Sequence, residues 1–236
     1  MINKIAAEDR HFADHGWLKT HWLFSFAEYF DPNNIHFGNL RVFNDDYVAP
    51  HSGFDTHPHS EMEIVTLVYR GALTHQDTMG NEIVINPGEA QRMSAGTGVR
   101  HSEYNHGDEP VELYQIWWFP DDKGLTPSYD QKKFSREILH NDLTPLVSNK
   151  DLPGVVSIHS DTTLYRGRFD RGNQTEVSPG NERGIFIYVT AGEISVNEIS
   201  LEKNDQARII QEESLVIRAN QDVDFILIDV PITTEN

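Results

Sequence analysis

The residues best suited to chemistry form two short motifs, His57-Pro58-His59 and His101-Ser102-Glu103. In an extended strand successive side chains point to opposite faces, so residues two apart share a face and lie roughly 7 Å apart along it. His57 and His59 therefore point the same way, as do His101 and Glu103. If the two strands are neighbours in a small barrel, three imidazoles and one carboxylate converge inside it. This spacing predicts a metal site.

The donor set of three nitrogens and one oxygen suits a divalent first-row ion, which leaves iron, nickel, copper, manganese and zinc open. Four protein ligands around an ion that prefers six leave two coordination positions for other molecules. A structural zinc ion favours four ligands, so the same donor set would leave it no such free positions. The chain has no cysteine, so disulfides and thiolate metal sites are excluded.

The alternative is that these histidines are ordinary surface or core residues. The chain contains 12 histidines, so a His-x-His pair could arise by chance. The neighbouring residues favour the metal interpretation, because Gly71 ends the first strand, Pro87-Gly88 marks a turn, and a glycine-rich bend precedes His101. That bend, residues 94–98, lacks the lysine and the following helix of a phosphate-binding loop.

These motifs carry a family resemblance. Gly53, His57-Pro58-His59, Glu63 and Gly71 resemble the first cupin motif, and Pro87-Gly88 with residues 101–105 resembles the second. The segments 15–17, 25–32, 74–77 and 93–103 are similar to the pirin family, over about residues 10–120. Within that family the chain looks most similar to the short bacterial pirin-like quercetin 2,3-dioxygenases.

The resemblance and the strand pattern together predict an all-β bicupin, with two stacked β-barrels or sandwiches of antiparallel strands. The expected division is an N-terminal metal-binding cupin (pirin) domain over residues 1–125, a connector over 126–153, and a C-terminal cupin-like domain over 154–236. That last part has one histidine, His159, and no His-x-His pair, so it is expected to lack metal ligands.

The resemblance implies a metal-dependent dioxygenase that opens the central ring of a flavonol such as quercetin with O2, releasing carbon monoxide. It implies His57, His59, His101 and Glu103 as ligands, Glu103 also as the catalytic base, and Fe(II) as the first choice of metal, with Ni, Cu, Mn, Co or Zn as alternatives. Two other functions stay open. One is a non-enzymatic, pirin-like metal-binding regulator or redox sensor that acts through an unidentified protein partner, and the other is a cupin isomerase or storage protein whose metal is structural.

Two further residues are candidates for contacting the ligands without binding the metal. Glu63 lies four residues after His59, and His75 lies in an expected strand. Each could orient a ligand histidine by accepting its free ring N–H, which fixes the tautomer. Packing is the alternative for His75.

The composition narrows the partners. With 236 residues and a net charge of −18, the chain is expected neither to bind nucleic acid directly nor to bind an anionic membrane surface. Its first ten residues include Lys4, Glu8, Asp9 and Arg10, which leave no apolar run of signal-peptide length, so no signal peptide is expected, and no run approaches the roughly 18 apolar residues of a membrane span. A cytoplasmic location is expected.

β-branched and aromatic runs between turn residues predict strands. Residues 121–153 are polar and are expected to form loop with one short turn of helix. Aromatic residues near the N-terminus are expected to pack outside the barrel, or else to line the mouth of the metal pocket; they are Trp17, Trp22, Phe24, Phe26, Tyr29 and Phe30. The expected strands are 40–44, 63–69, 73–75, 83–85, 112–119, 155–159, 163–169, 184–190, 193–196, 214–218 and 224–230.

Overall fold

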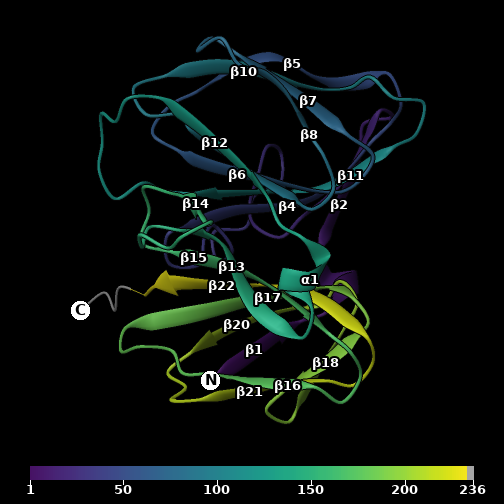
Figure 1. The fold of residues 1–236 in the computed structure, drawn as a ribbon, viewed down its shortest axis with the longest axis vertical. Coiled ribbons are helices and arrows are strands. Elements are labelled where there is room, and N and C mark those ends of the chain that lie inside the picture. Colours follow the sequence, from purple (N-terminus) through teal and green to yellow (C-terminus); the bar gives the residue numbers. More distant parts are fainter. Residues whose placement is uncertain (233–236) are drawn as a thin grey trace.

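A computed structural model describes residues 1–232, and almost all of its regular structure is β-strand. Four sheets lie in layers, a four-stranded and a seven-stranded sheet in each half of the molecule (Figure 1). The two seven-stranded sheets face each other in the middle. The predicted all-β fold of two stacked antiparallel sandwiches is confirmed.

The N-terminal half pairs a seven-stranded sheet, ordered β12-β9-β6-β11-β4-β3-β2, with a four-stranded sheet, ordered β5-β10-β7-β8. The strands of the first are β12 (Ser128–Lys133), β9 (Glu89–Ser94), β6 (Glu63–Arg70), β11 (Val111–Trp118), β4 (Leu40–Val48), β3 (Leu18–Trp22) and β2 (His11–Asp14). Those of the second are β5 (Ser52–His59), β10 (Val99–Asn105), β7 (Leu73–Asp77) and β8 (Glu82–Ile85).

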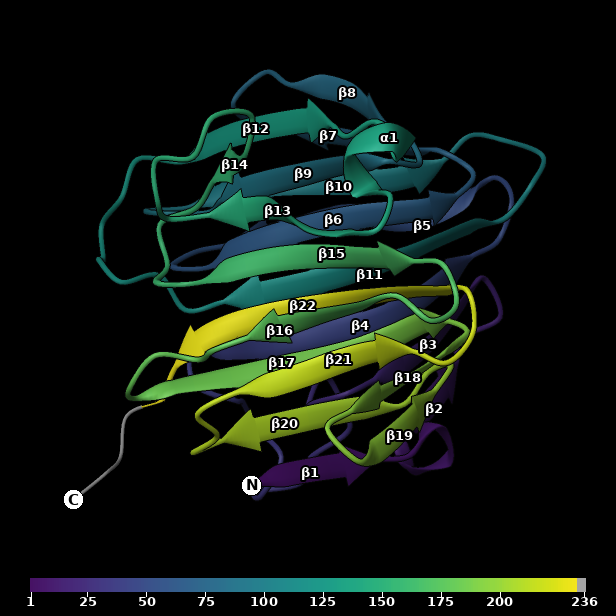
Figure 2. The same ribbon diagram turned by 60° about the horizontal axis from the view of Figure 1, so that its bottom comes forward.

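The C-terminal half repeats this arrangement with sheets ordered β1-β20-β17-β22-β15-β13-β14 and β16-β21-β18-β19 (Figure 2). The first sheet contains β1 (Ile2–Ile5), β20 (Gln206–Ile210), β17 (Arg183–Ala191), β22 (Val223–Pro231), β15 (Thr163–Phe169), β13 (Asp142–Ser148) and β14 (Val156–Ser157). The second contains β16 (Gln174–Val177), β21 (Leu215–Ala219), β18 (Glu193–Val196) and β19 (Ile199–Glu202).

A shared apolar core joins the two halves. Phe43 on β4 packs against Phe186 and Tyr188 on β17, with ring centroids 5.3 and 4.9 Å apart. Trp118 on β11 is fully buried in the same core. Because strands β4, β6 and β11 bury one face here, their other face is left to line the interior of the N-terminal sandwich.

The interiors of the two sandwiches differ in chemistry. Apolar side chains such as Ile187, Phe225 and Leu227 fill the C-terminal one. The N-terminal one buries polar groups across neighbouring strands, where Gln91 lies opposite Thr66, Thr66 opposite Gln115, and Gln115 opposite Asn44. Buried polar groups without partners are costly, so this polar interior points to a site rather than to a packing core.

The strand pattern of the sequence missed several elements. The expected connector contains β12 and β13, with the expected turn of helix between them as α1 (Arg136–Leu139), capped by the Ser135 side chain. Strand β4 continues through Asp45 and Asp46, which were expected to follow the strand.

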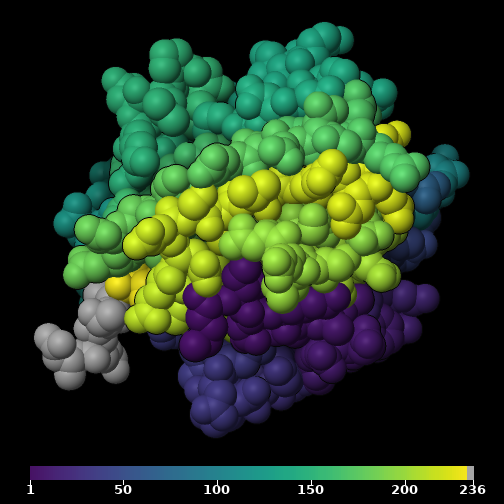
Figure 3. All heavy atoms as spheres, turned by 90° about the horizontal axis from the view of Figure 1, so that it is seen from below, coloured from purple at the N-terminus to yellow at the C-terminus, as the bar shows by residue number. Residues whose placement is uncertain are grey.

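The N-terminal segment crosses from one half to the other. Strand β1 pairs antiparallel with β20 of the C-terminal sheet, while β2 belongs to the N-terminal sheet; the 3-10 helix η1 (Ala7–Asp9) lies between them in sequence. In Figure 3 the first residues, in purple, lie between the green and yellow C-terminal residues and the blue residues of the N-terminal half. The division between sheets therefore does not coincide with residue 125. Among residues 1–232, no helix is both long and apolar enough to cross a bilayer.

Candidate metal centre

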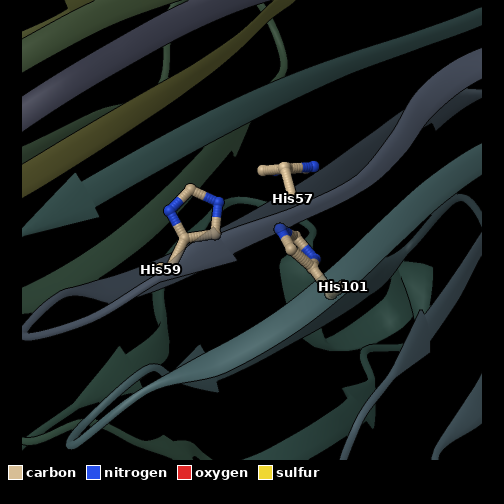
Figure 4. Close-up of side chains that lie close together, drawn as sticks. All are labelled: His57, His59 and His101. Atoms are coloured by element: carbon tan, nitrogen blue, oxygen red, sulfur yellow. The ribbon is translucent and has the colours of Figure 1, made fainter.

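Strands β5 and β10 bring three histidines together inside the N-terminal sandwich. His57 lies directly opposite His101 in the ladder, and His59 shares the face of His57. The ring centroids of His57 and His101 are 4.5 Å apart, and His59 lies 4.8 and 4.9 Å from the other two (Figure 4). One nitrogen from each ring lies within 4.8 Å of the others. This spacing is close enough for one ion to contact all three rings.

The hydrogen bonds leave the ring nitrogens ready for an ion. Nδ1 of His57 lies 2.7 Å from the carbonyl oxygen of Asp55, to which it can donate, so its Nε2 is left with a lone pair. Nε2 of His59 and Nε2 of His101 are buried and have no partner among the described residues. Two buried, unpartnered nitrogens beside a third ligand nitrogen are what an imidazole-bound metal would satisfy, so the residues fit a divalent ion.

The protonation states agree with this role. Burial, and then the neighbouring His101 and His57, lower the pKa of His59 to about 4. Burial, His57 and His75 lower the pKa of His101 to about 3. Both rings are therefore neutral near pH 7, and a neutral imidazole is the form that binds metals.

His101 is held from behind by a second histidine. Its Nδ1 lies 3.4 Å from Nδ1 of His75, and Nε2 of His75 lies 2.9 Å from the Asp77 carboxylate. Asp77 accepts only, so His75 carries its proton on Nε2 and can accept the Nδ1–H of His101. This chain of Asp77, His75 and His101 directs Nε2 of His101 into the cluster. The structure thus places His75 against His101, and that His75 orients a metal ligand stays a prediction.

Glu103 lies close to His101 and belongs with it and His75 to a second cluster, which overlaps the first at His101. Gln115 donates to its Oε2 at 2.6 Å, and Thr66 donates to its Oε1 at 3.3 Å. A register shift between β5 and β10 falls between His101 and Glu103, which are paired with His57 and Phe54 respectively. The carboxylate is therefore anchored to the wall opposite β10 rather than grouped with all three rings.

Glu63 does not take the place expected for it. Its Oε2 accepts the backbone N–H of His159 at 3.2 Å, in the C-terminal half. On β6 it lies three residues from Thr66, hence on the opposite face of the strand from the site. The expectation that Glu63 orients a ligand histidine is wrong, because the strand face that it occupies belongs to the interface between the two halves.

Residues that the sequence did not single out complete the site. Trp117 packs edge-on against His59 at 4.9 Å, donates its Nε1–H to Gln115 at 3.2 Å, and contacts Phe26 at 5.4 Å. Of the N-terminal aromatic residues, Phe26 thus lies beside the site, whereas Phe24 packs on Phe186 in the core between the halves. Alternation along the expected strand 112–119 places Gln115 and Trp117 on the same face. It does not show whether that face points to the metal site.

Comparison with known proteins agrees with this geometry. Residues 5–118 match the family model described as pirin, and residues 145–230 match one described as the quercetinase C-terminal cupin domain. A protein of Escherichia coli K12 named quercetin 2,3-dioxygenase is 40% identical over 232 residues, covering 98% of this chain and 99% of its own. The chain belongs to the pirin family.

The similarity to other pirins extends over nearly the whole chain. A pirin-like protein of Caulobacter vibrioides is 41% identical over 230 residues, 97% of this chain and 99% of its own. The crystal structure of the bacterial pirin YhhW from E. coli in complex with nickel(II) has a TM-score of 0.94 and 39% identity, with 99% of this chain and 100% of that one covered. A divalent metal site in this pirin is thus supported by its own buried nitrogens and by a metal complex of a relative.

Proposed function

We propose that this pirin is a metal-dependent dioxygenase that opens the central ring of a flavonol with O2, with the ion held by His57, His59, His101 and Glu103. The observation that carries the proposal is the pair of buried, unpartnered Nε2 atoms of His59 and His101, pointing at the same space as His57. Relatives named quercetin 2,3-dioxygenase across the full chain support the reaction class.

When bound, a divalent ion supplies positive charge that lowers the pKa of a hydroxyl placed beside it. Three neutral imidazoles and one carboxylate would cancel only one of such an ion's two charges, so this donor set would favour the anionic form of the substrate hydroxyl. Glu103 then takes the proton of the flavonol hydroxyl. Gln115 and Thr66 hold one oxygen each of Glu103, which fixes the orientation of the carboxylate next to His101.

The wall of Trp117 and Phe26 positions the substrate. The two rings meet edge-on at 5.4 Å, next to His59. Planar aromatic rings gain from offset or edge-on contact with such side chains. Trp117 also holds Gln115, so the residue that orders the aromatic wall also orders the support of Glu103.

The test is consumption of quercetin and O2 by the protein loaded with Fe(II), which we propose as the working metal, and in parallel with Ni(II). Glu103→Gln should keep part of the metal but lose turnover by about 100-fold or more, as expected for loss of a general base. Glu109→Gln, a change of the same kind in the exposed turn after β10, serves as control. Turnover no faster than with free ion would refute the proposal, and wild-type turnover by Glu103→Gln would refute the role of Glu103.

A further inference from the structure

A second cavity lies between the two halves, on the other side of the N-terminal seven-stranded sheet from the metal centre. Its volume is about 360 Å³. On β11, Tyr114 lines it while the adjacent Gln115 faces Glu103; on β4, Asp45 faces the C-terminal half. We call it the interdomain crevice; its lining includes Arg10, Lys19, Asp45, Tyr69, Tyr114 and Lys203.

Two buried side chains present polar atoms without partners to the interdomain crevice. The Arg10 side chain is 5% exposed; its Nε donates to Ala7 and its Nη1 to Asp45 and Tyr188. Its Nη2 makes no hydrogen bond to residues 1–232. Tyr114 is 7% exposed, and its hydroxyl likewise has no partner in that range. A guanidinium with an unused N–H pair beside an unused phenol is a ready donor set for a carboxylate.

The charges of the interdomain crevice favour an anion. Lys19 and Lys203 line it and form no ion pair with any described residue, and Arg10 adds a third cation. Three acidic residues line it: Asp45 is paired with Arg10 at 2.9 Å, Glu112 is paired with Arg70 at 3.6 Å, and Asp46 follows Asp45 on β4, so its side chain points to the opposite face of the strand. In a chain of net charge −18, two unpaired lysines in one concave site are unusual, and such unpaired cations attract anions.

The walls of the interdomain crevice are aromatic. Tyr69 and Tyr114 meet edge-on with centroids 4.6 Å apart, and Tyr47 and Phe12 stand at the rim, 37% and 52% exposed. Aromatic walls with a few convergent polar groups, placed between two folded units, are typical of small-molecule sites. The volume is also within the range of such sites.

We propose that the interdomain crevice binds a small aromatic carboxylate, with the carboxylate on Arg10 and the two lysines and the ring against Tyr69 and Tyr114. This site uses none of the metal-centre residues, so it stands independently of the proposed dioxygenase activity. Tyr114 and Gln115 are neighbours on β11. A ligand that contacts Tyr114 on one face of the sheet is therefore one residue away from Gln115, which donates to Glu103 on the other face.

The experiment is calorimetric titration of the nickel-loaded protein with 4-hydroxybenzoate, and with 4-hydroxybenzyl alcohol as the uncharged counterpart. We expect a dissociation constant below about 1 mM for the carboxylate and binding at least about tenfold weaker for the alcohol. The double variant Lys19→Gln/Lys203→Gln should weaken carboxylate binding at least about tenfold. Lys123→Gln/Lys133→Gln removes the same charge elsewhere and should bind as wild type.

His57→Ala separates this site from the metal centre and should leave 4-hydroxybenzoate binding unchanged. The proposal is overturned if the carboxylate fails to bind at about 5 mM, if the two double variants bind alike, or if His57→Ala abolishes binding. The last result would place the ligand on the metal instead. None of these results depends on turnover, so failure here is distinguishable from failure of the proposed function.

Discussion

Replacing His75 by phenylalanine tests how far His101 depends on the residue behind it. Phenylalanine keeps a ring in the space next to Tyr129, 5.1 Å away, but removes the acceptor for Nδ1–H of His101 and the donor to Asp77. A buried donor left unpaired costs about 1–3 kcal/mol. The ring of His101 can avoid that cost only by leaving the orientation in which Nε2 faces the cluster.

We therefore expect nickel(II) to bind His75→Phe about 10- to 100-fold more weakly than wild type, the range seen when residues that orient metal ligands are lost. The assay is competition with a chromophoric chelator, alongside nitrogen-15 NMR of the metal-free protein to identify which nitrogen of His101 carries the proton. His75→Gln keeps an acceptor oxygen and should recover part of the affinity.

Gln76→Ala, at an exposed position on the same strand, is the matched control and should bind nickel as wild type does. Wild-type affinity in a folded His75→Phe protein would refute the reasoning. An NMR spectrum showing the proton of His101 on Nε2 in the wild type would do so too, because Nδ1 must carry that proton to donate to His75.

Three further predictions concern the surroundings of the site. Gln115→Leu removes the 2.6 Å hydrogen bond to Glu103 and should lower kcat/KM for a flavonol about 10- to 100-fold. The metal content, measured by elemental analysis, should stay near that of the wild type. A kcat/KM equal to that of the wild type would contradict this role of Gln115. Gly53→Ala would place a Cβ 2.2 Å from the Glu103 carbonyl oxygen, so it should lower the free energy of unfolding by about 1–3 kcal/mol and reduce metal retention. Urea titration measures the first effect and elemental analysis the second. Wild-type values in both would contradict the prediction. Burial raises the pKa of Asp46 from 3.8 to about 7, so the folded protein holds a proton that the unfolded chain releases, and the free energy of unfolding falls as the pH rises from about 4 to 7. Asp46→Asn should reduce this fall, measured by urea titrations at pH 4 and 8. An equal fall in the variant and the wild type would contradict the raised pKa of Asp46.

The common orientation of His57 and His59 could be predicted because alternation in a strand is a local property. His57 and His59 share a face whatever the strand pairs with, and the glycine-rich bend before His101 marks the return of the chain. The pairing itself is not local. Nothing in the sequence shows that the register between β5 and β10 shifts after His101, and this shift decides how Glu103 lies relative to the rings.

The failure at Glu63 has the same cause. In this chain β6 is buried on both faces, so its apolar run does not reveal which face lines the site and which faces the other half. Strand β12 was missed for a different reason. It is an edge strand with half-exposed polar residues, and such a strand carries no alternation to detect.

The pairing of β1 with β20 has a consequence for how the protein folds during synthesis. Strand β1 forms its ladder with β20, so Ile2 pairs with Ile209 and Ile5 with Gln206. During synthesis this strand leaves the ribosome long before its partner, because residues 6–205 lie between them. This edge of the C-terminal sheet therefore closes late and across a very long loop, and such non-local closure is slow. A bulky fusion at the start of the chain should for this reason delay maturation more than one placed elsewhere.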